Sequence, residues 1–135
     1  MRYVIIGGSA AGISAVEAIR SVDCSSEIEL FSYEHTPLYS RVLLSYYIAE
    51  MLSKEELHFR PLDFFMDNNV TAHLGQKVQT VSPETKSIRT EDGRDLPYDK
   101  LLIATGSSAK LLNIPGVDKK GVFAMRNLEH AQGII

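Results

Sequence analysis

The sequence predicts an α/β fold: a parallel sheet with helices beside it and a small antiparallel β-meander. Three observations support this. An apolar run at residues 2–6 is followed by a glycine-rich turn and an amphipathic segment, three short β-like stretches lie within residues 76–96, and a second apolar run occupies residues 100–104. Strand, turn, helix and strand in succession form a βαβ unit, so the first two strands are expected to be parallel.

The composition is that of an ordinary globular domain with a real core. The chain has 135 residues, of which 44% are apolar and 23% are charged. A net charge of −3 gives no reason to expect nucleic acid or an anionic membrane as a partner. No apolar run approaches the roughly 20 residues that cross a bilayer. With no recognisable signal peptide, we expect a cytoplasmic protein, and we expect Cys24, the single cysteine, to be an ordinary thiol.

The first elements follow from hydrophobic patterning. Residues 2–6 have an all-apolar centre that suits a strand in a sheet covered on both faces. Residues 10–22 are expected to form a helix in which Glu17 and Arg20 can face water. The apolar face of this helix carries Ile13, Val16 and Ile19. Residues 27–31 alternate charged and apolar side chains, which predicts the second strand.

The middle of the chain predicts two further helices and a strand. A loop at residues 35–39 precedes the apolar and aromatic residues 42–52, which we expect to form a helix on the sheet. Residues 53–56 match a capping box. Pro61 suits the first position of a helix over residues 61–69, and a short parallel strand follows at residues 70–72.

From residue 76 onward, the chain predicts mainly short strands. Residues 76–81, 87–90 and 94–96 are short and β-like, and Asp92-Gly93 is a typical hairpin turn, so they predict an antiparallel meander. Residues 100–104 are expected to form another buried strand. Near the end of the chain, a helix is expected to begin within residues 127–133.

The turn at residues 7–12 reads GGSAAG and is a candidate phosphate cradle. In a βαβ turn the first glycine permits the bend, the second lets backbone approach a pyrophosphate, and the third lets helix and strand pack. The middle position is Ser9, whose Cβ restricts that approach but whose hydroxyl can donate to a phosphate. N–H groups at the helix start favour an anion. The candidate residues are Gly7, Gly8, Ser9, Ala10, Ala11 and Gly12; the alternative is a tight turn without a ligand.

An acidic residue is expected about 20 residues after this turn, at the end of the second strand, where it binds ribose hydroxyls. Glu34 lies at about this spacing from Gly12. Its carboxylate would repel a 2′-phosphate, which disfavours NADP at this position; the alternative is a solvated loop carboxylate. His35 borders the same site. The four histidines show no metal-ligand spacing, so no metal is expected.

Residues 98–106, YDKLLIATG, carry the most specific signal. They resemble the Y-D-x-L-L-I-A-T-G signature of the flavin-dependent pyridine nucleotide–disulfide oxidoreductase superfamily. With the turn, Glu34 and the meander in that family's order, the resemblance covers essentially the whole chain. It implies a Rossmann-like FAD/NAD(P)-binding fold with FAD in the first turn and backbone contacts from Ala104, Thr105 and Gly106. It also implies that Val78 contacts the adenine through its backbone groups. The alternative for Val78 is an ordinary strand residue.

Residues 37–45, PLYSRVLLS, are similar to a stretch of nitrite reductase large subunits and of rubredoxin and ferredoxin reductases. The match implies that Arg41 contacts the FAD phosphates, a role that suits a guanidinium; a surface arginine is the alternative. Residues 34–50 contain no cysteine, although members with a redox cysteine carry it there. Tyr46 occupies the place of a lysine found in many ferredoxin reductases. We assign no catalytic residue.

The resemblance implies the FAD-binding segment of an NAD(P)H-dependent flavin oxidoreductase without a redox-active cysteine. Electrons would pass from NAD(P)H through FAD to rubredoxin, ferredoxin, a nitrite reductase-type centre or another small acceptor. We expect residues 1–110 to be an FAD-binding half-domain and residues 111–135 a connector toward an NAD(P)H-binding domain, with this piece inactive alone and a homo-oligomer left open. The alternative is a non-catalytic nucleotide-binding or assembly module. The meander and the ATG strand argue against an NAD-dependent dehydrogenase.

Overall fold

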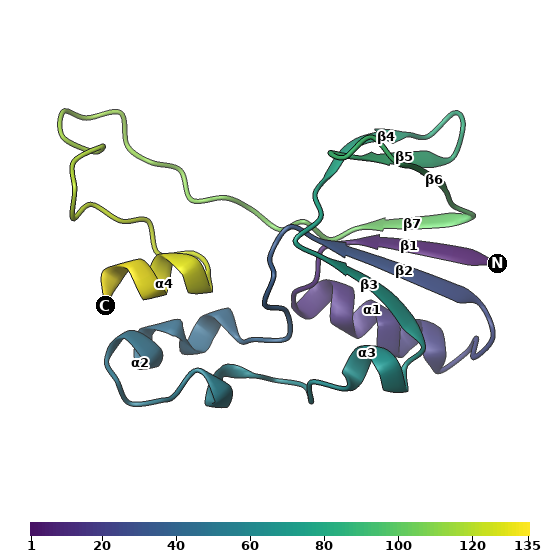
Figure 1. The fold of residues 1–135 in the computed structure, drawn as a ribbon, viewed down its shortest axis with the longest axis horizontal. Helices are drawn as coiled ribbons and strands as arrows, with labels where there is room; N and C mark the ends of the chain where they lie inside the picture. Colours follow the sequence, from purple (N-terminus) through teal and green to yellow (C-terminus); the bar gives the residue numbers. More distant parts are fainter. The chain divides into compact units, whose positions relative to one another are not determined.

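The computed structural model describes all 135 residues, which divide into two compact units (Figure 1). The sheet unit comprises residues 1–38 and 60–105, and the helical unit comprises residues 39–59 and 106–135. The predicted functional division at residue 110 concerns cofactor contacts and stays a prediction.

A four-stranded parallel sheet is the centre of the sheet unit. Its strands are ordered β3-β2-β1-β7. Their bounds are β1 (Arg2–Ile6), β2 (Glu27–Ser32), β3 (Val70–Leu74) and β7 (Lys100–Ile103). All three neighbouring pairs are parallel, with Tyr3 opposite both Ile28 and Lys100. The predicted βαβ unit is therefore confirmed.

Two helices of the sheet unit lie on one side of this sheet (Figure 1). They are α1 (Ala10–Arg20) and α3 (Phe64–Asp67). Ile13 and Val16 of α1 are fully buried, as the pattern predicts. The helix α1 ends two residues earlier than expected, within the usual uncertainty of helix ends. The expected helix 61–69 is reduced to α3, because the Phe64 N–H donates to the Pro61 carbonyl and residues 61–63 form a turn.

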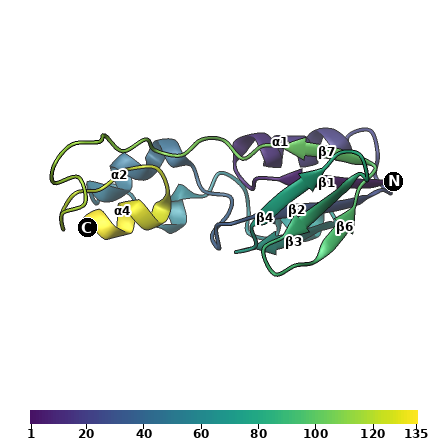
Figure 2. The same cartoon turned by 90° about the horizontal axis from the view of Figure 1, so that it is seen from above.

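The antiparallel meander covers the opposite side of the sheet; viewed from above, its strands cross the parallel ones (Figure 2). Its strands are β4 (Val78–Ser82), β5 (Ser87–Thr90) and β6 (Asp95–Pro97), in the order β4-β5-β6. Gly93 has a φ of +84° in the predicted hairpin turn. Ile88 packs with Val4, Ile6 and Phe31 in one buried cluster. This follows from alternation along β1, which sends Val4 and Ile6 to the same face.

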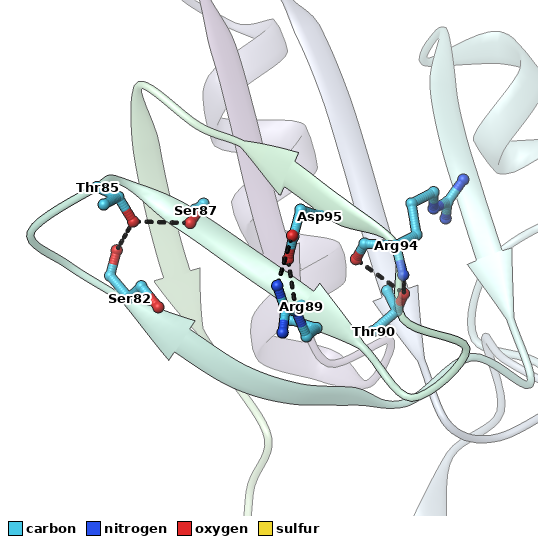
Figure 3. A network of polar contacts seen from close by, with 7 residues as sticks. All are labelled: Ser82, Thr85, Ser87, Arg89, Thr90, Arg94 and Asp95. Carbon is cyan, nitrogen blue, oxygen red and sulfur yellow. Dashed lines mark hydrogen bonds and ion pairs between the residues drawn. The ribbon is translucent and has the colours of Figure 1, made fainter.

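Polar contacts fix the two hairpins of the meander (Figure 3). The Arg89 guanidinium donates to both carboxylate oxygens of Asp95 at 2.8 and 2.7 Å, which ties β5 to β6. The Thr85 and Ser87 hydroxyls are 2.9 Å apart at the first turn. The meander predicted for residues 76–96 is therefore confirmed in its strands and in its pairing.

The strand β7 differs from the prediction. Leu102 is 40% exposed and Ile103 is 60% exposed, so this is not a buried strand. The physical reason is its place at the edge of the sheet, where β1 is its only neighbouring strand. Leu101 packs against the cluster under the meander, and it is the part of the apolar run that the sheet unit covers.

The helical unit is built on a small cluster of its own. Its regular elements are a 3₁₀ turn (Arg41–Leu43), α2 (Leu44–Ile48), a second 3₁₀ turn (Glu55–Leu57) and α4 (Leu128–Ile134). The buried side chains of its core are Tyr39, Leu44, Leu57, Leu128 and Ala131. The Asn127 side chain accepts a hydrogen bond from the His130 N–H at 2.9 Å and so caps α4, which confirms the helix expected there.

The helix expected over residues 42–52 is wrong in both length and partner. Only α2 is α-helical, and its partner is α4 of the same unit. The capping box is present in half: the Glu56 carboxylate accepts from the Ser53 N–H at 2.8 Å, just before the second 3₁₀ turn. None of the helices combines the length and the apolar character that a membrane crossing needs.

Candidate functional site

The carboxyl ends of three parallel strands meet at one edge of the sheet. The Gly7 N–H donates to the Phe31 carbonyl and the Ala104 N–H donates to the Ile6 carbonyl, both at 2.8 Å. The strand order places β2 and β3 on one side of β1 and β7 on the other. The chain therefore reverses its direction of travel across the sheet at β1, and such a switch point is where open α/β sheets bind ligands.

The backbone packing at this edge leaves room only for glycine at the first and third glycine positions of the turn, Gly7 and Gly12. Gly7 has a φ of +124°, and a Cβ there would overlap the Ala104 carbonyl oxygen. Gly12 is buried, and a Cβ there would overlap the Gly7 carbonyl oxygen and lie 3.3 Å from a methyl group of Ile5. The turn, the start of α1 and the backbone of Ala104 and Thr105 therefore approach one another closely.

The start of α1 can bind an anion. Ser9 is the N-cap residue in extended conformation, and the first bond of the helix runs from the Ile13 N–H to the Ser9 carbonyl at 3.0 Å. The N–H groups of residues 10–12 accordingly lie outside the helical ladder. The first turn of α1 contains no acidic residue, so nothing there offsets the positive end of the helix dipole.

Ser32 contacts both the glycine turn and the acidic loop, which is the loop after β2 that carries Glu34. A Cβ on Gly8 would lie 3.1 Å from the Ser32 Cβ and 3.3 Å from its Oγ, so the two residues are packed tightly. The Ser32 Oγ accepts a hydrogen bond from the Glu34 N–H at 3.2 Å, and Ser32 is only 7% exposed. Sequence reasoning missed Ser32; the available signal is a small polar residue at the last position of a strand.

The corner between β3 and β4 holds His35 and leads into Val78. The His35 ring lies against the backbone of Gly75, which directly follows β3. Sequence reasoning also missed Gly75, because the predicted strand ended at residue 72. The Val78 side chain packs against the cluster beneath the meander. A ligand contact from Val78 would therefore have to use its backbone, as the resemblance implies.

Arg41 and Gly106 belong to the helical unit. The Arg41 Nη1 donates to the Tyr39 hydroxyl at 3.1 Å and to the Arg126 carbonyl at 3.0 Å. Gly106 has a φ of +68°, and a Cβ there would lie 3.2 Å from Arg126 Nη2. Both residues are ordered by partners inside their own unit, and their contacts with FAD stay predictions.

No group of three or more histidine, cysteine, aspartate or glutamate side chains is placed to hold a metal ion. Cys24 is an exposed free thiol whose Sγ lies 3.3 Å from the Arg20 carbonyl, just after α1.

The fold and this edge define a class of protein, the dinucleotide-binding α/β proteins, with a glycine turn at the switch point of a parallel sheet. The comparison with known families is more specific. The sequence model of the family described as pyridine nucleotide-disulphide oxidoreductase matches residues 1–135, and the chain belongs to this family.

Curated relatives include the assimilatory nitrate reductase electron transfer subunit of Bacillus subtilis (strain 168), 34% identical over 99% of this chain. The nitrite reductase [NAD(P)H] of the same organism is 36% identical over 95% of this chain. The rubredoxin-NAD(+) reductase of Ectopseudomonas oleovorans is 29% identical over 99%. The chain spans 18%, 16% and 35% of these proteins, respectively.

Solved structures with the same fold include reductases. The structure of the covalent putidaredoxin reductase–putidaredoxin complex has a TM-score of 0.90 and 28% identity, covering 98% of this chain and 33% of that one. The NADH:rubredoxin oxidoreductase of Clostridium acetobutylicum has a TM-score of 0.86 and 25% identity, covering 97% of this chain and 34% of that one. The predicted Rossmann-like fold and the predicted family are both confirmed.

Proposed function

We propose that this chain is the FAD-binding segment of an NAD(P)H-dependent flavin oxidoreductase. The observation that carries the proposal is the close approach of Gly7 to Ala104, which brings the glycine turn and the first residues of the ATG segment to one edge. The names of the relatives support the same class, since they include reductases that use NAD(P)H or NAD(+).

The residues at this edge fit a dinucleotide pyrophosphate. Gly7 and Gly12 have no space for a side chain, because the carbonyl groups of Ala104 and Gly7 lie where their Cβ atoms would be, so the turn packs tightly against the start of α1 and the end of β7. The N–H groups at the start of α1 have no partner within the helix, which suits an anion. When bound, FAD would supply hydride acceptance from a nicotinamide and the release of electrons to an acceptor.

Each candidate residue has a defined task in this proposal. Residues 7–12 bind the pyrophosphate through backbone N–H groups, and the Ser9 hydroxyl donates to a phosphate oxygen. The Glu34 carboxylate accepts hydrogen bonds from the ribose hydroxyls and excludes a 2′-phosphate. His35 and the Val78 backbone border the adenosine. Residues 104–106 contribute backbone, and Arg41 contributes a cation to the phosphates.

The acceptor is proposed to be a small electron carrier or another small molecule. Two solved structures similar to this chain are named for putidaredoxin and for rubredoxin as partners of the respective reductases. Residues 34–50 lack a cysteine, so the proposed reductase works without a disulfide relay in that segment.

The test uses the full-length protein that contains residues 1–135. The proposal predicts a bound flavin with its visible absorption bands, bleached by NADH or NADPH in the absence of oxygen. A protein that is colourless and cannot be reconstituted with FAD would contradict it. Bound FAD that neither nicotinamide reduces would instead favour the non-catalytic module.

A further inference from the structure

The corner between β3 and β4 carries an unusual contact between a glycine and a ring. Gly75 has a φ of +70°, a backbone conformation that residues with a side chain rarely adopt. The Cε1 and Nδ1 atoms of His35 occupy the space where its Cβ would be. His35 therefore lies on bare backbone, and any other residue at position 75 would displace the ring.

The same corner fixes the backbone of the acidic loop. The Gly75 N–H donates to the Glu34 carbonyl at 3.2 Å, and the Gln76 N–H donates to the Ser32 carbonyl at 2.9 Å. Since the Glu34 N–H is also bonded to the Ser32 side chain, both sides of Glu34 are held. Gly75 thus touches the loop in two ways: it bonds the Glu34 backbone and supports the His35 ring.

The backbone conformation of Gly75 explains the glycine, but it does not explain why an exposed ring lies on it. His35 is exposed, so its ring adds little to the core of the sheet unit. The ring is nevertheless confined on the side of Gly75, next to the residue proposed to bind the ribose. Confinement of an exposed ring beside a ligand site is a positioning device, because it removes rotamers before the ligand binds.

We infer that Gly75 is a positioning residue of the dinucleotide site, and that it acts by holding the His35 imidazole at the adenosine end beside Glu34. The inference rests on the proposed function, since it assigns the adenosine end of FAD to this loop. Gly75 itself need not touch the ligand.

The test compares Gly75→Ala with Gly93→Ala in the full-length protein freed of FAD. Gly93 is a matched control: its φ is +84°, and no atom lies within 4 Å of the Cβ that the change adds. Both variants carry the strain of an alanine at positive φ, and we expect similar losses in the midpoint of thermal unfolding. ADP, which carries the adenosine end without the flavin, is the probe in isothermal titration calorimetry.

We expect Gly75→Ala to raise the Kd for ADP about tenfold, the effect of losing one ordinary hydrogen bond or contact, and Gly93→Ala to leave it unchanged. In a His35→Ala background the added Cβ has room, so Gly75→Ala should then affect ADP no more than Gly93→Ala. Equal effects of the two glycine changes in the wild-type background would overturn the inference. A Gly75→Ala effect of the same size in both backgrounds would overturn the action through His35.

A failure of this inference can be distinguished from a failure of the proposed function. If the unmodified protein binds neither FAD nor ADP, the dinucleotide site itself is wrong. If it binds both and Gly75→Ala behaves like Gly93→Ala, the site stands and the positioning role of Gly75 is wrong.

Discussion

At the scale of single residues, Glu34 is the side chain whose placement matters most for the choice of nucleotide. Its N–H donates to the Ser32 hydroxyl and its carbonyl accepts from the Gly75 N–H, at 3.2 Å each. These two hydrogen bonds fix the backbone of Glu34 on both sides. The Glu34 side chain is therefore attached at a defined position just after β2.

Replacing Glu34 with alanine should raise the Kd for FAD in the full-length protein about 10- to 100-fold, since hydrogen bonds to a charged group contribute roughly 1.5–3 kcal/mol. The measurement is a fluorescence titration of the flavin-free protein. Glu84→Ala is the matched control, because Glu84 is an exposed carboxylate of the sheet unit in the turn between β4 and β5. Equal affinities of the two variants would place the ribose elsewhere.

Sequence alone could predict that positions 7 and 12 need glycine, because the bend at Gly7 and the packing of α1 against its own strand at Gly12 are local requirements. It did not reveal that the Ala104 carbonyl also fills the space beside Gly7. It could not predict Ser32 and Gly75. Their contacts depend on which distant backbone approaches them, Gly8 for the one and His35 for the other. Such pairings are decided by tertiary packing rather than by spacing along the chain.

At the scale of elements, the loop between α1 and β2 is organised by one carboxylate. Asp23 accepts hydrogen bonds from the Ser26 hydroxyl at 2.5 Å and from the Ser26 and Ser25 N–H groups at 3.0 and 3.2 Å. These bonds, the Ser26 hydroxyl first, lower the pKa of Asp23 from 3.8 to about 2. The charged form is therefore favoured in the folded state.

A pKa lowered by folding gives stability that is complete above the unfolded value and is lost as the pH falls through the folded value. The contribution of Asp23 should thus be present above pH 3.8 and disappear toward about pH 2. Urea unfolding at pH 5, 3 and 2 measures this. The difference in unfolding free energy between the wild type and Asp23→Asn should shrink across that range. A difference that does not change with pH would contradict the assignment, and Glu84→Gln serves as the exposed control.

The error over residues 42–52 has a cause at this scale. The helix α2 ends in two hydrogen bonds, from the Met51 N–H to the Tyr46 carbonyl at 2.9 Å and from the Glu50 N–H to the Tyr47 carbonyl at 3.0 Å. This is a Schellman motif, with Glu50 in the left-handed region at a φ of +55°. Glycine usually occupies this position at the end of a helix. Because Glu50 occupies it here, the sequence did not indicate that the helix ends there.

Other elements followed from the sequence because their signals are local. Alternation and the Asp92-Gly93 turn predict the meander, and the structure has it. Arg20 shows the opposite case: it was expected to face water. Its guanidinium instead donates to backbone carbonyls, Asn68 and Asn69 among them, which lie far along the chain. A long polar side chain on a helix surface does not reveal which distant carbonyls it will reach.

At the scale of the whole molecule, the order of the elements was predictable, whereas their exposure was not. The apolar run at residues 100–104 suggested a buried strand, but β7 leaves Leu102 and Ile103 uncovered at the edge of the sheet. Whether an edge strand is buried depends on the segments that pack beside it. The residue pattern of the strand alone does not reveal those segments.

Residues 1–135 alone should bind FAD weakly or not at all. The chain spans 16% to 35% of the three curated relatives described above, and residues 1–110 are expected to be only an FAD-binding half-domain. Fluorescence titration of FAD with this piece, compared with the full-length protein, measures the difference. Tight one-to-one binding by the piece would show that these residues contain a complete site.

The central claim is that the turn GGSAAG holds the pyrophosphate of FAD at the carboxyl edge of the sheet, and Ser9→Glu tests it most directly. The change places negative charge and bulk at the start of α1, where the phosphates are proposed to lie. Thr85→Glu, in the exposed β4–β5 turn, adds the same charge away from the site. The measurement is the flavin content per chain of the folded full-length variants. We predict near-complete loss of FAD with Ser9→Glu and full content with Thr85→Glu; full flavin in Ser9→Glu would contradict the claim.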